Sequence, residues 1–252
     1  MMRSAGILMP ISSLDSPFGI GCFSKEAYQF VDFLKASGQS YWQILPIGPT
    51  GFGDSPYQSV SAFAGNPYFI DPVTLKEEGL LTEEELWSFD FGSDPEKVDY
   101  GKLYNCRYQL LKMAFDHFVE QGGVSDKAYT SFKAAEAYWL DDYSLFMAIK
   151  LEQEGKSWLD WPKELRTRQE AALEEARTSL KEQIEFYCFM QFEFCQQWKK
   201  LKEYANAEDI EIIGDMPFFV SMDSVDLWSH PEVFSTGKDG SPKEVAGTPA
   251  DA

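Results

Sequence analysis

Two short apolar runs flank a helical pattern near the start of the chain. Residues 5–11 and 41–47 are mostly apolar and are bounded by polar or glycine-containing segments, as in strands buried within a parallel sheet. Residues 24–37 between them place apolar side chains on one helical face, with Ser24 positioned to cap the helix and Gly38 positioned to end it. This order predicts a βαβ unit with a right-handed crossover.

A third apolar run, residues 210–220, predicts another strand that leads to Gly214 and Asp215. The pattern therefore supplies three convincing core strands, whereas a (β/α)8 barrel needs eight. Two architectures fit, a small three-stranded α/β domain and an incomplete barrel. The abrupt end of the sequence favours the second, so we expect an α/β fold that is a partial (β/α)8 TIM barrel with about the first three strands.

The region between the second and third strands is predicted to be mainly helical. Thr82 and Glu85 have the spacing of a capping box, and residues 164–205 predict a long helix that is charged at first and apolar later. Asp223 is positioned to cap the helix that reaches Trp228. Another helix is predicted from side chains with a four-three spacing on one face, which are Tyr104, Tyr108, Leu111, Phe115 and Phe118.

These patterns divide the chain into three parts. Residues 1–74 contain the first two strands and a long loop rich in Gly, Pro and Ser, which we expect to be functional because it directly follows a parallel strand. Residues 75–175 form the mainly helical insertion. Residues 176–252 continue the barrel with a helix, the third strand and a truncated loop.

Composition and charge narrow the classes of partner. Hydrophobic residues make up 44% and aromatic residues 15% of the 252-residue chain, which suits a large core and also suits the apolar faces of sugar rings. The net charge of −19 argues against nucleic acid and against an anionic membrane surface, since both bind through Lys and Arg clusters. A neutral polymer such as a glucan meets no such barrier.

Cysteine and histidine usage argues against several kinds of site. The four cysteines form no C-x-x-C pair, and the only histidines are His117 and His230. A zinc site and a Ser-His-Asp or Cys-His catalytic set are therefore disfavoured. Reduced thiols, the lack of a signal sequence and the lack of a long apolar run predict a cytoplasmic protein that neither is secreted nor spans a membrane.

Two places along the chain carry candidate chemistry. In the loop after the second strand, Pro56 biases Ser55 toward an extended conformation, and this rigid turn could hold Tyr57 as a platform under a sugar ring. Asp215 follows the third strand, where barrel strands point carboxylates at a shared active-site face. Each has an alternative, since Tyr57 could pack the loop down and Asp215 could cap its own loop. No pair of carboxylates suited to glycoside chemistry is evident.

Several segments together resemble the 4-alpha-glucanotransferase (amylomaltase) family of the α-amylase clan. The resemblance runs from the first strand to the last residue, and the order and spacing of its motifs make it specific. The matching segments are residues 6–14, 18–21, 42–50, Gly53-Asp-Ser-Pro-Tyr-Gln58, 61–68, 142–148, Gln197-Trp198, Ile213-Gly-Asp-Met-Pro-Phe-Phe-Val220 and 246–249.

The resemblance implies the transfer of an α-1,4-glucan segment from a donor to another glucan or to glucose. It implies a covalent glucosyl-enzyme intermediate on an Asp, with retention of configuration and with no cofactor or metal. The expected partner is an α-1,4-glucan or a maltooligosaccharide. By their places in the motifs, Tyr57 lines the sugar subsite just before the cleaved bond, Ser55 is its polar neighbour, Asp215 orients active-site groups or a sugar hydroxyl, and Pro249 and Asp251 begin the acceptor-side loop. We expect the segments around residues 57 and 215 to converge on one open end of the barrel.

The same resemblance places the catalytic carboxylates outside this chain. The nucleophile Asp and the acid/base Glu are expected beyond residue 252, so the 252 residues are expected to be inactive alone. Two alternatives stay open, a half-barrel that binds glucan without catalysis and a hydrolase of the same clan that uses water in place of the acceptor sugar.

Overall fold

The structure is a computed structural model that describes residues 3–51, 53–92, 94, 96–237, 240–241 and 243–244. The chain divides into two compact units. The first consists of Met1–Ile47, Gly65–Ala135 and Phe189–Met216, and the second consists of Gly48–Ala64, Glu136–Cys188 and Pro217–Ala252. These boundaries differ from the predicted ones at residues 74 and 175, and the division into barrel and insertion stays a prediction.

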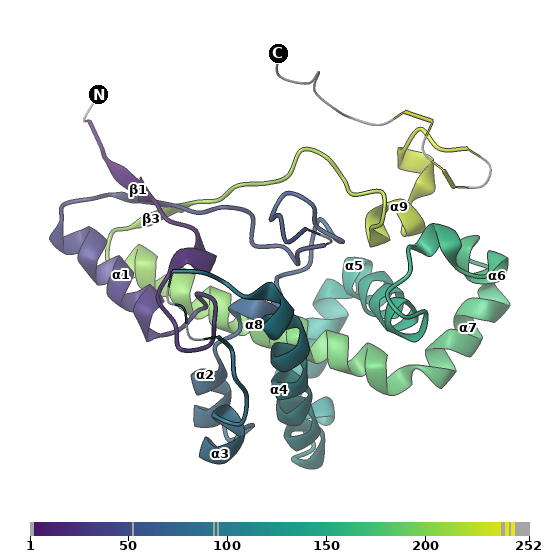
Figure 1. Ribbon diagram of the computed structural model, residues 1–252, viewed down its shortest axis with the longest axis horizontal. Helices are drawn as coiled ribbons and strands as arrows, with labels where there is room; N and C mark the ends of the chain where they lie inside the picture. The colour runs from purple at the N-terminus through teal and green to yellow at the C-terminus, as the bar shows by residue number, and fades with distance from the viewer. Residues whose placement is uncertain are drawn as a thin grey trace. The chain divides into compact units, whose positions relative to one another are not determined.

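Helices separate the short strands along the described chain, and Figure 1 labels β1, β3 and the α-helices. The strands are β1 Gly6–Leu8, β2 Tyr41–Gln43 and β3 Glu211–Ile213. The α-helices are α1 Lys25–Ala36, α2 Pro72–Glu77, α3 Glu83–Leu86, α4 Tyr100–Glu120, α5 Lys127–Glu152, α6 Lys163–Arg166, α7 Glu170–Ser179, α8 Lys181–Ala207 and α9 Val225–Ser229. Single 3-10 turns are η1 Ile11–Ser13, η2 Pro67–Phe69, η3 Gly123–Ser125, η4 Trp158–Asp160 and η5 Pro231–Val233.

The first unit contains a three-stranded parallel sheet in the order β1-β2-β3. Ile7 pairs with Trp42, and Trp42 pairs with Ile212. Because all three strands run in the same direction, their carboxyl ends lie at one edge of the sheet. The predicted parallel sheet with many helices between its strands is therefore confirmed.

The strands are shorter and less buried than their apolar runs predict. Trp42 on the middle strand is fully buried, and its indole Nε1 donates to the Met9 carbonyl at 2.8 Å. On the outer strands, Leu8 and Ile213 are 52% and 44% exposed. Each outer strand has one neighbour among the described strands, so its side chains are only partly covered.

Helix α1 ends as its sequence predicts but begins differently. Gly38 adopts a φ of +70°, and its N–H donates to the Lys35 carbonyl at 3.0 Å, which is a glycine-terminated helix end. Ser24 occupies the N-cap position but accepts no backbone N–H there. Its hydroxyl donates to Glu26 Oε2 at 2.6 Å instead, so the predicted side-chain cap is wrong.

Helices α4 and α8 contribute aromatic side chains to the core of the first unit. The ring centroids of Phe118 and Phe189 lie 4.9 Å apart. Tyr104, predicted on the buried face of α4, is 65% exposed. The buried face starts with Leu103 and Arg107 instead. Each of these lies one position before a predicted residue, Tyr104 or Tyr108, so the buried face is rotated around the helix by one residue.

The long helix predicted over residues 164–205 is divided into α6, α7 and α8. Arg168, between α6 and α7, has a φ of +52°. A residue in this left-handed region cannot continue a right-handed helix. Leu180 then separates α7 from α8 as the C-cap residue of α7. The composition of the segment is helical throughout, and it carries no Gly or Pro that would mark these breaks.

The predicted capping box at the start of α3 is confirmed. Thr82 Oγ1 accepts the Glu85 N–H at 3.1 Å, and Glu85 Oε2 accepts the Thr82 N–H at 2.8 Å. Thr82→Ala is expected to lower the free energy of unfolding by about 1 kcal/mol, measured by urea denaturation, because the helix loses this cap. Thr178→Ala is the control, since that hydroxyl donates to the Glu174 carbonyl within a helix. Equal losses in the two variants would contradict a role of the cap.

Candidate functional site

The loop that follows β2 forms a hairpin in the second unit. The Gly51 N–H donates to the Gln58 carbonyl at 2.9 Å, and Thr50 and Ser59 form an antiparallel bridge. These contacts hold the two arms of the loop in register. The turn between the arms carries both residues that were predicted to bind sugar in this loop.

The turn itself depends on two successive left-handed residues. Gly53 has a φ of +89° and Asp54 a φ of +56°. Glycine adopts this conformation without strain, and Asp is one of the few other residues that tolerates it. The Gly-Asp pair therefore sets the direction in which the chain enters Ser55.

Ser55 and Tyr57 are tied together by a short local contact. The Tyr57 N–H donates to Ser55 Oγ at 3.3 Å, and the Gln58 N–H donates to the Ser55 carbonyl at 3.1 Å. Tyr57 is 41% exposed, and Ser55 is half-buried. The turn thus fixes the backbone of Tyr57 while much of the side chain stays accessible to a ligand.

Asp215 lies in the first unit, directly after β3 and Gly214. Its carboxylate is exposed, and Oδ1 accepts the N–H of Met216 at 2.8 Å. This hydrogen bond to the backbone is what we expect if Asp215 caps its own loop. The exposed position at the carboxyl edge of the sheet is what the active-site interpretation requires, so one carboxylate satisfies both.

Helix α9 contacts the end of the loop 48–64, called the Tyr57 loop below, within the second unit. The Val225 N–H donates to the Val60 carbonyl at 2.9 Å, and Asp226 Oδ2 accepts the Ala62 N–H at 2.9 Å. Burial raises the pKa of Asp226. This pairing was not predicted, because nothing in the spacing of residues 60–62 and 225–226 indicates that they meet.

Asp223 has a different role from the predicted one. Ser224 caps α9, with its Oγ accepting the Leu227 N–H at 3.3 Å. Asp223 instead forms an ion pair with Lys150 at 2.6 Å and accepts the Trp158 N–H at 3.2 Å. The prediction is wrong by one position, since the neighbouring serine is an equally good cap and leaves the carboxylate to neutralise a half-buried lysine.

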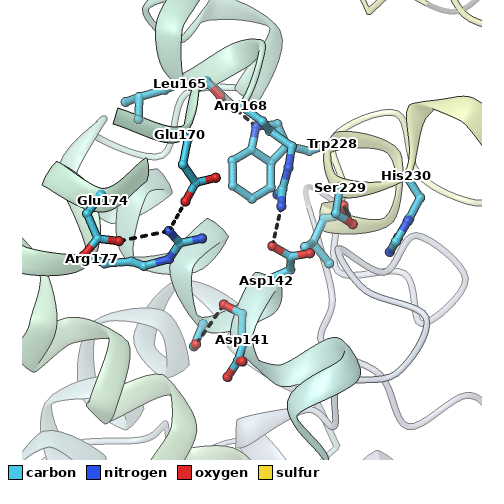
Figure 2. A network of polar contacts seen from close by, with 12 residues as sticks. Asp141, Asp142, Leu165, Arg168, Glu170, Glu174, Arg177, Trp228, Ser229 and His230 are labelled. Carbon is cyan, nitrogen blue, oxygen red and sulfur yellow. Dashed lines mark hydrogen bonds and ion pairs between the residues drawn. The ribbon is translucent and has the colours of Figure 1, made fainter. Parts of the chain in front are cut away.

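A polar network around Trp228 holds α9 in the second unit (Figure 2). Arg168 lies between Trp228 and Asp142, with its Cζ 4.2 Å from the indole ring and its Nη2 2.6 Å from the carboxylate. The Trp228 Nε1 donates to the Leu165 carbonyl at 3.0 Å. His230 lies at the C-cap of α9. The Asp142 carboxylate carries the ion pair with Arg168.

Disulfides and metal sites depend on the cysteines and the other potential metal ligands among the described residues. None of the four cysteines forms a disulfide, and burial raises the pKa of the Cys22 thiol to about 11. In the part of the chain that the structure describes, no group of three or more His, Cys, Asp or Glu residues is placed to hold a metal ion. No helix within that part is long and apolar enough to cross a membrane. The cytoplasmic location stays a prediction.

A family model described as 4-alpha-glucanotransferase matches residues 9–252. The chain belongs to the 4-alpha-glucanotransferase family. It is 48% identical over 250 residues to a 4-alpha-glucanotransferase of Thermus thermophilus and 45% identical over 245 residues to one of Clostridium butyricum. These alignments cover 99% and 97% of this chain but 49% and 50% of the relatives. The chain thus spans about half the length of the curated relatives it matches.

Solved structures of the same family agree with the fold. The amylomaltase of Streptococcus agalactiae, solved in complex with acarbose, superimposes with a TM-score of 0.96 at 44% identity over 100% of this chain and 50% of that one. The amylomaltase of Corynebacterium glutamicum matches with a TM-score of 0.67 at 18% identity over 90% of this chain and 32% of that one, which shows a shared fold.

The predicted site residues fall in three groups within this member of the 4-alpha-glucanotransferase family. Ser55 and Tyr57 lie together in one turn of the second unit, and Asp215 lies at the sheet edge of the first unit. Their predicted convergence on one sugar stays a prediction. Pro249 and Asp251 lie outside the described residues.

Proposed function

We propose that the protein is a 4-alpha-glucanotransferase that transfers α-1,4-glucan segments between maltodextrins with retention of configuration. The observation that carries the proposal is the match of residues 9–252 to this family, supported by the TM-score of 0.96 to an amylomaltase. In this proposal the parallel sheet is the beginning of a (β/α)8 barrel, whose active site lies at the carboxyl ends of its strands.

The turn with Ser55 and Tyr57 is proposed as one wall of the sugar site. Tyr57 is 41% exposed, and its aromatic ring is proposed to offer an apolar face to a glucose ring while its hydroxyl adds a hydrogen-bonding group. Because the turn is already ordered by its own hydrogen bonds, little conformational entropy is lost when sugar binds. Asp215 is proposed to orient a sugar hydroxyl or a neighbouring catalytic group.

The bond-making residues are proposed to lie in the half of the family fold that this chain does not align with. Retaining chemistry needs two carboxyl groups about 5–5.5 Å apart, a nucleophile Asp and an acid/base Glu. The Asp attacks the anomeric carbon while the Glu protonates the leaving sugar oxygen. The Glu then removes the proton from the acceptor 4-hydroxyl, which attacks the glucosyl-enzyme in place of water. Pro249 and Asp251 are proposed to border the acceptor side.

Incubation with maltotriose tests this proposal directly. A full-length protein of the family that contains this chain is expected to give glucose together with a ladder of longer maltodextrins. The 252-residue chain alone is expected to give neither, because it lacks the proposed nucleophile and acid/base. Glucose and maltose without longer products from the full-length protein would indicate hydrolysis, and a ladder from the 252 residues would refute their expected inactivity.

Tyr57→Ala is expected to raise KM for maltotriose about tenfold in the full-length protein, which corresponds to ~1.4 kcal/mol of lost binding. Tyr57→Phe keeps the ring and is expected to stay within about threefold of the parent, since one hydroxyl contributes less than the ring face. The control is Tyr138→Ala, which removes another tyrosine that is 68% exposed in the second unit. Unchanged kinetics in Tyr57→Ala would remove Tyr57 from the sugar site.

A further inference from the structure

Two buried glutamines of α8 hold the segment that follows the Tyr57 loop. Gln191 Oε1 accepts the Gly65 N–H at 2.7 Å, and its Nε2 donates to the Gly65 carbonyl at 2.9 Å. Gln197 pairs with Asp71 in the same manner, at 2.7 and 3.5 Å. Each side-chain amide therefore engages both the donor and the acceptor of one backbone residue, as a neighbouring strand does.

Arg107 of α4 holds the same segment between the two glutamine contacts. Its Nη2 donates to the carbonyls of Tyr68 and Ile70 at 2.7 and 2.8 Å. The guanidinium is fully buried, with Phe18 and Phe91 rings 5.8 and 6.0 Å from its Cζ. Within the described part of the chain, its Nε and Nη1 have no hydrogen-bond partner. The two short hydrogen bonds of this buried cation thus go to the backbone of one segment.

The residues on the two sides of the loop are joined to each other within the first unit. The Asn66 N–H donates to the Ile47 carbonyl at 2.8 Å, which joins the residue before the loop to the segment after it. Gly65 lies directly on α8, because a Cβ there would come within 2.2 Å of the Phe194 ring. The backbone at the base of the loop is therefore fixed, whereas its tip carries Tyr57.

We infer that Arg107, Gln191 and Gln197 form a loop-base clamp that positions the sugar-binding loop. This inference rests on the proposed function for the role of the loop. All three residues are positioning residues, since they act through the backbone of residues 65–71 and not through contact with sugar.

The polar character of the clamp supports positioning over simple packing. Apolar side chains of similar volume could fill these places without the desolvation cost of buried amides and a buried cation. What the amides add is a defined position and direction of the backbone. Both glutamines pair with residues 126 positions earlier in the chain, so the segment 65–71 and α8 run in the same direction. Binding sites need their side chains held within about 0.5 Å, which a fixed loop base provides.

The test compares Gln191→Met with Gln196→Met in the full-length protein. Methionine keeps the volume and removes both hydrogen bonds, and Gln196 is a half-buried neighbour on the same helix that is not part of the clamp. Gln191→Met is expected to lower the hydrogen-exchange protection of the loop amides of Gly51 and Gln58 about tenfold. It is also expected to raise KM for maltotriose about fivefold while kcat changes less than twofold. Gln196→Met is expected to leave both quantities unchanged.

Gln191→Glu provides a rescue that a packing role does not predict. A protonated Glu can donate to the Gly65 carbonyl and accept the Gly65 N–H as glutamine does, whereas the carboxylate cannot donate. Protection factors of the loop are therefore expected to approach the parent at low pH and to fall at high pH. Equal protection and equal KM in Gln191→Met and Gln196→Met, or a pH-independent Gln191→Glu, would overturn the clamp. If the unsubstituted full-length protein transfers no glucan, the proposed function is wrong. The hydrogen-exchange measurements still show whether Gln191 orders the loop.

Discussion

Trp228→Ala is expected to lower the free energy of unfolding of the second unit by about 3–5 kcal/mol, the range for truncating a large buried aromatic side chain. Trp228 is 1% exposed, and its ring centroid lies 5.6 Å from Phe146 and 5.8 Å from Trp161. The substitution also leaves Arg168 without the ring it stacks on and the Leu165 carbonyl without its indole donor. The cavity and the unpaired polar groups add to one another.

Urea denaturation followed by far-UV circular dichroism measures this loss. Trp228→Phe retains ring packing and loses the hydrogen bond to Leu165, so it is expected to cost about 1–2 kcal/mol. Val233→Ala, at a position that is 72% exposed shortly after α9, is expected to change stability by less than about 0.5 kcal/mol. A loss below about 1 kcal/mol for Trp228→Ala would contradict the close packing of Trp228 against Phe146 and Trp161.

Glu193→Gln is expected to stabilise the protein at alkaline pH. Glu193 on α8 is 2% exposed, and burial, followed by the neighbouring Glu78 carboxyl, raises its pKa to about 8. An unfolded chain releases this proton near pH 4.5, whereas the folded chain retains it to about pH 8. Between these values the folded state binds more protons, so its stability falls as pH rises and is constant above the folded pKa.

The amide in Glu193→Gln cannot ionise and so removes this pH-dependent penalty. The variant is expected to match the parent near pH 4.5 and to exceed it by roughly 2–5 kcal/mol at pH 9, measured as unfolding free energies across the pH range. Glu203→Gln removes the same charge from an exposed position of the same helix and serves as the control. A stability difference between Glu193→Gln and the parent that does not change with pH would rule out the buried proton.

The places of the strands could be predicted from the sequence, but their lengths could not. The apolar runs around Ile7, Trp42 and Ile212 are each found in the parallel sheet, because burial of a strand requires such a run. Strand ends depend on which residues have a hydrogen-bonding neighbour, and this is a property of the whole sheet. Helix caps were also predicted only in part. The capping box at Thr82 is specified by two residues and is present, whereas the Ser24 hydroxyl donates to Glu26 and does not cap its helix.

The polar contacts that hold the candidate site could not be predicted. Gln191 pairs with a backbone 126 positions away, and Asp226 with one 164 positions away. Such pairs leave no periodic pattern, since neither a backbone amide nor a lone glutamine is marked in the sequence. The turn before Tyr57 was predicted from Pro56, which restricts the backbone of Ser55. The left-handed conformations of Gly53 and Asp54, which set its direction, were not predicted.

The central prediction is that the Tyr57 turn and Asp215 serve one sugar site. A crystal structure of the full-length protein with acarbose measures this most directly. We expect the Tyr57 ring in van der Waals contact with a sugar ring and the Asp215 carboxylate within hydrogen-bonding distance of the same ligand or of a group that contacts it. Acarbose bound away from both residues, or Tyr57 and Asp215 at opposite ends of the sheet, would contradict it.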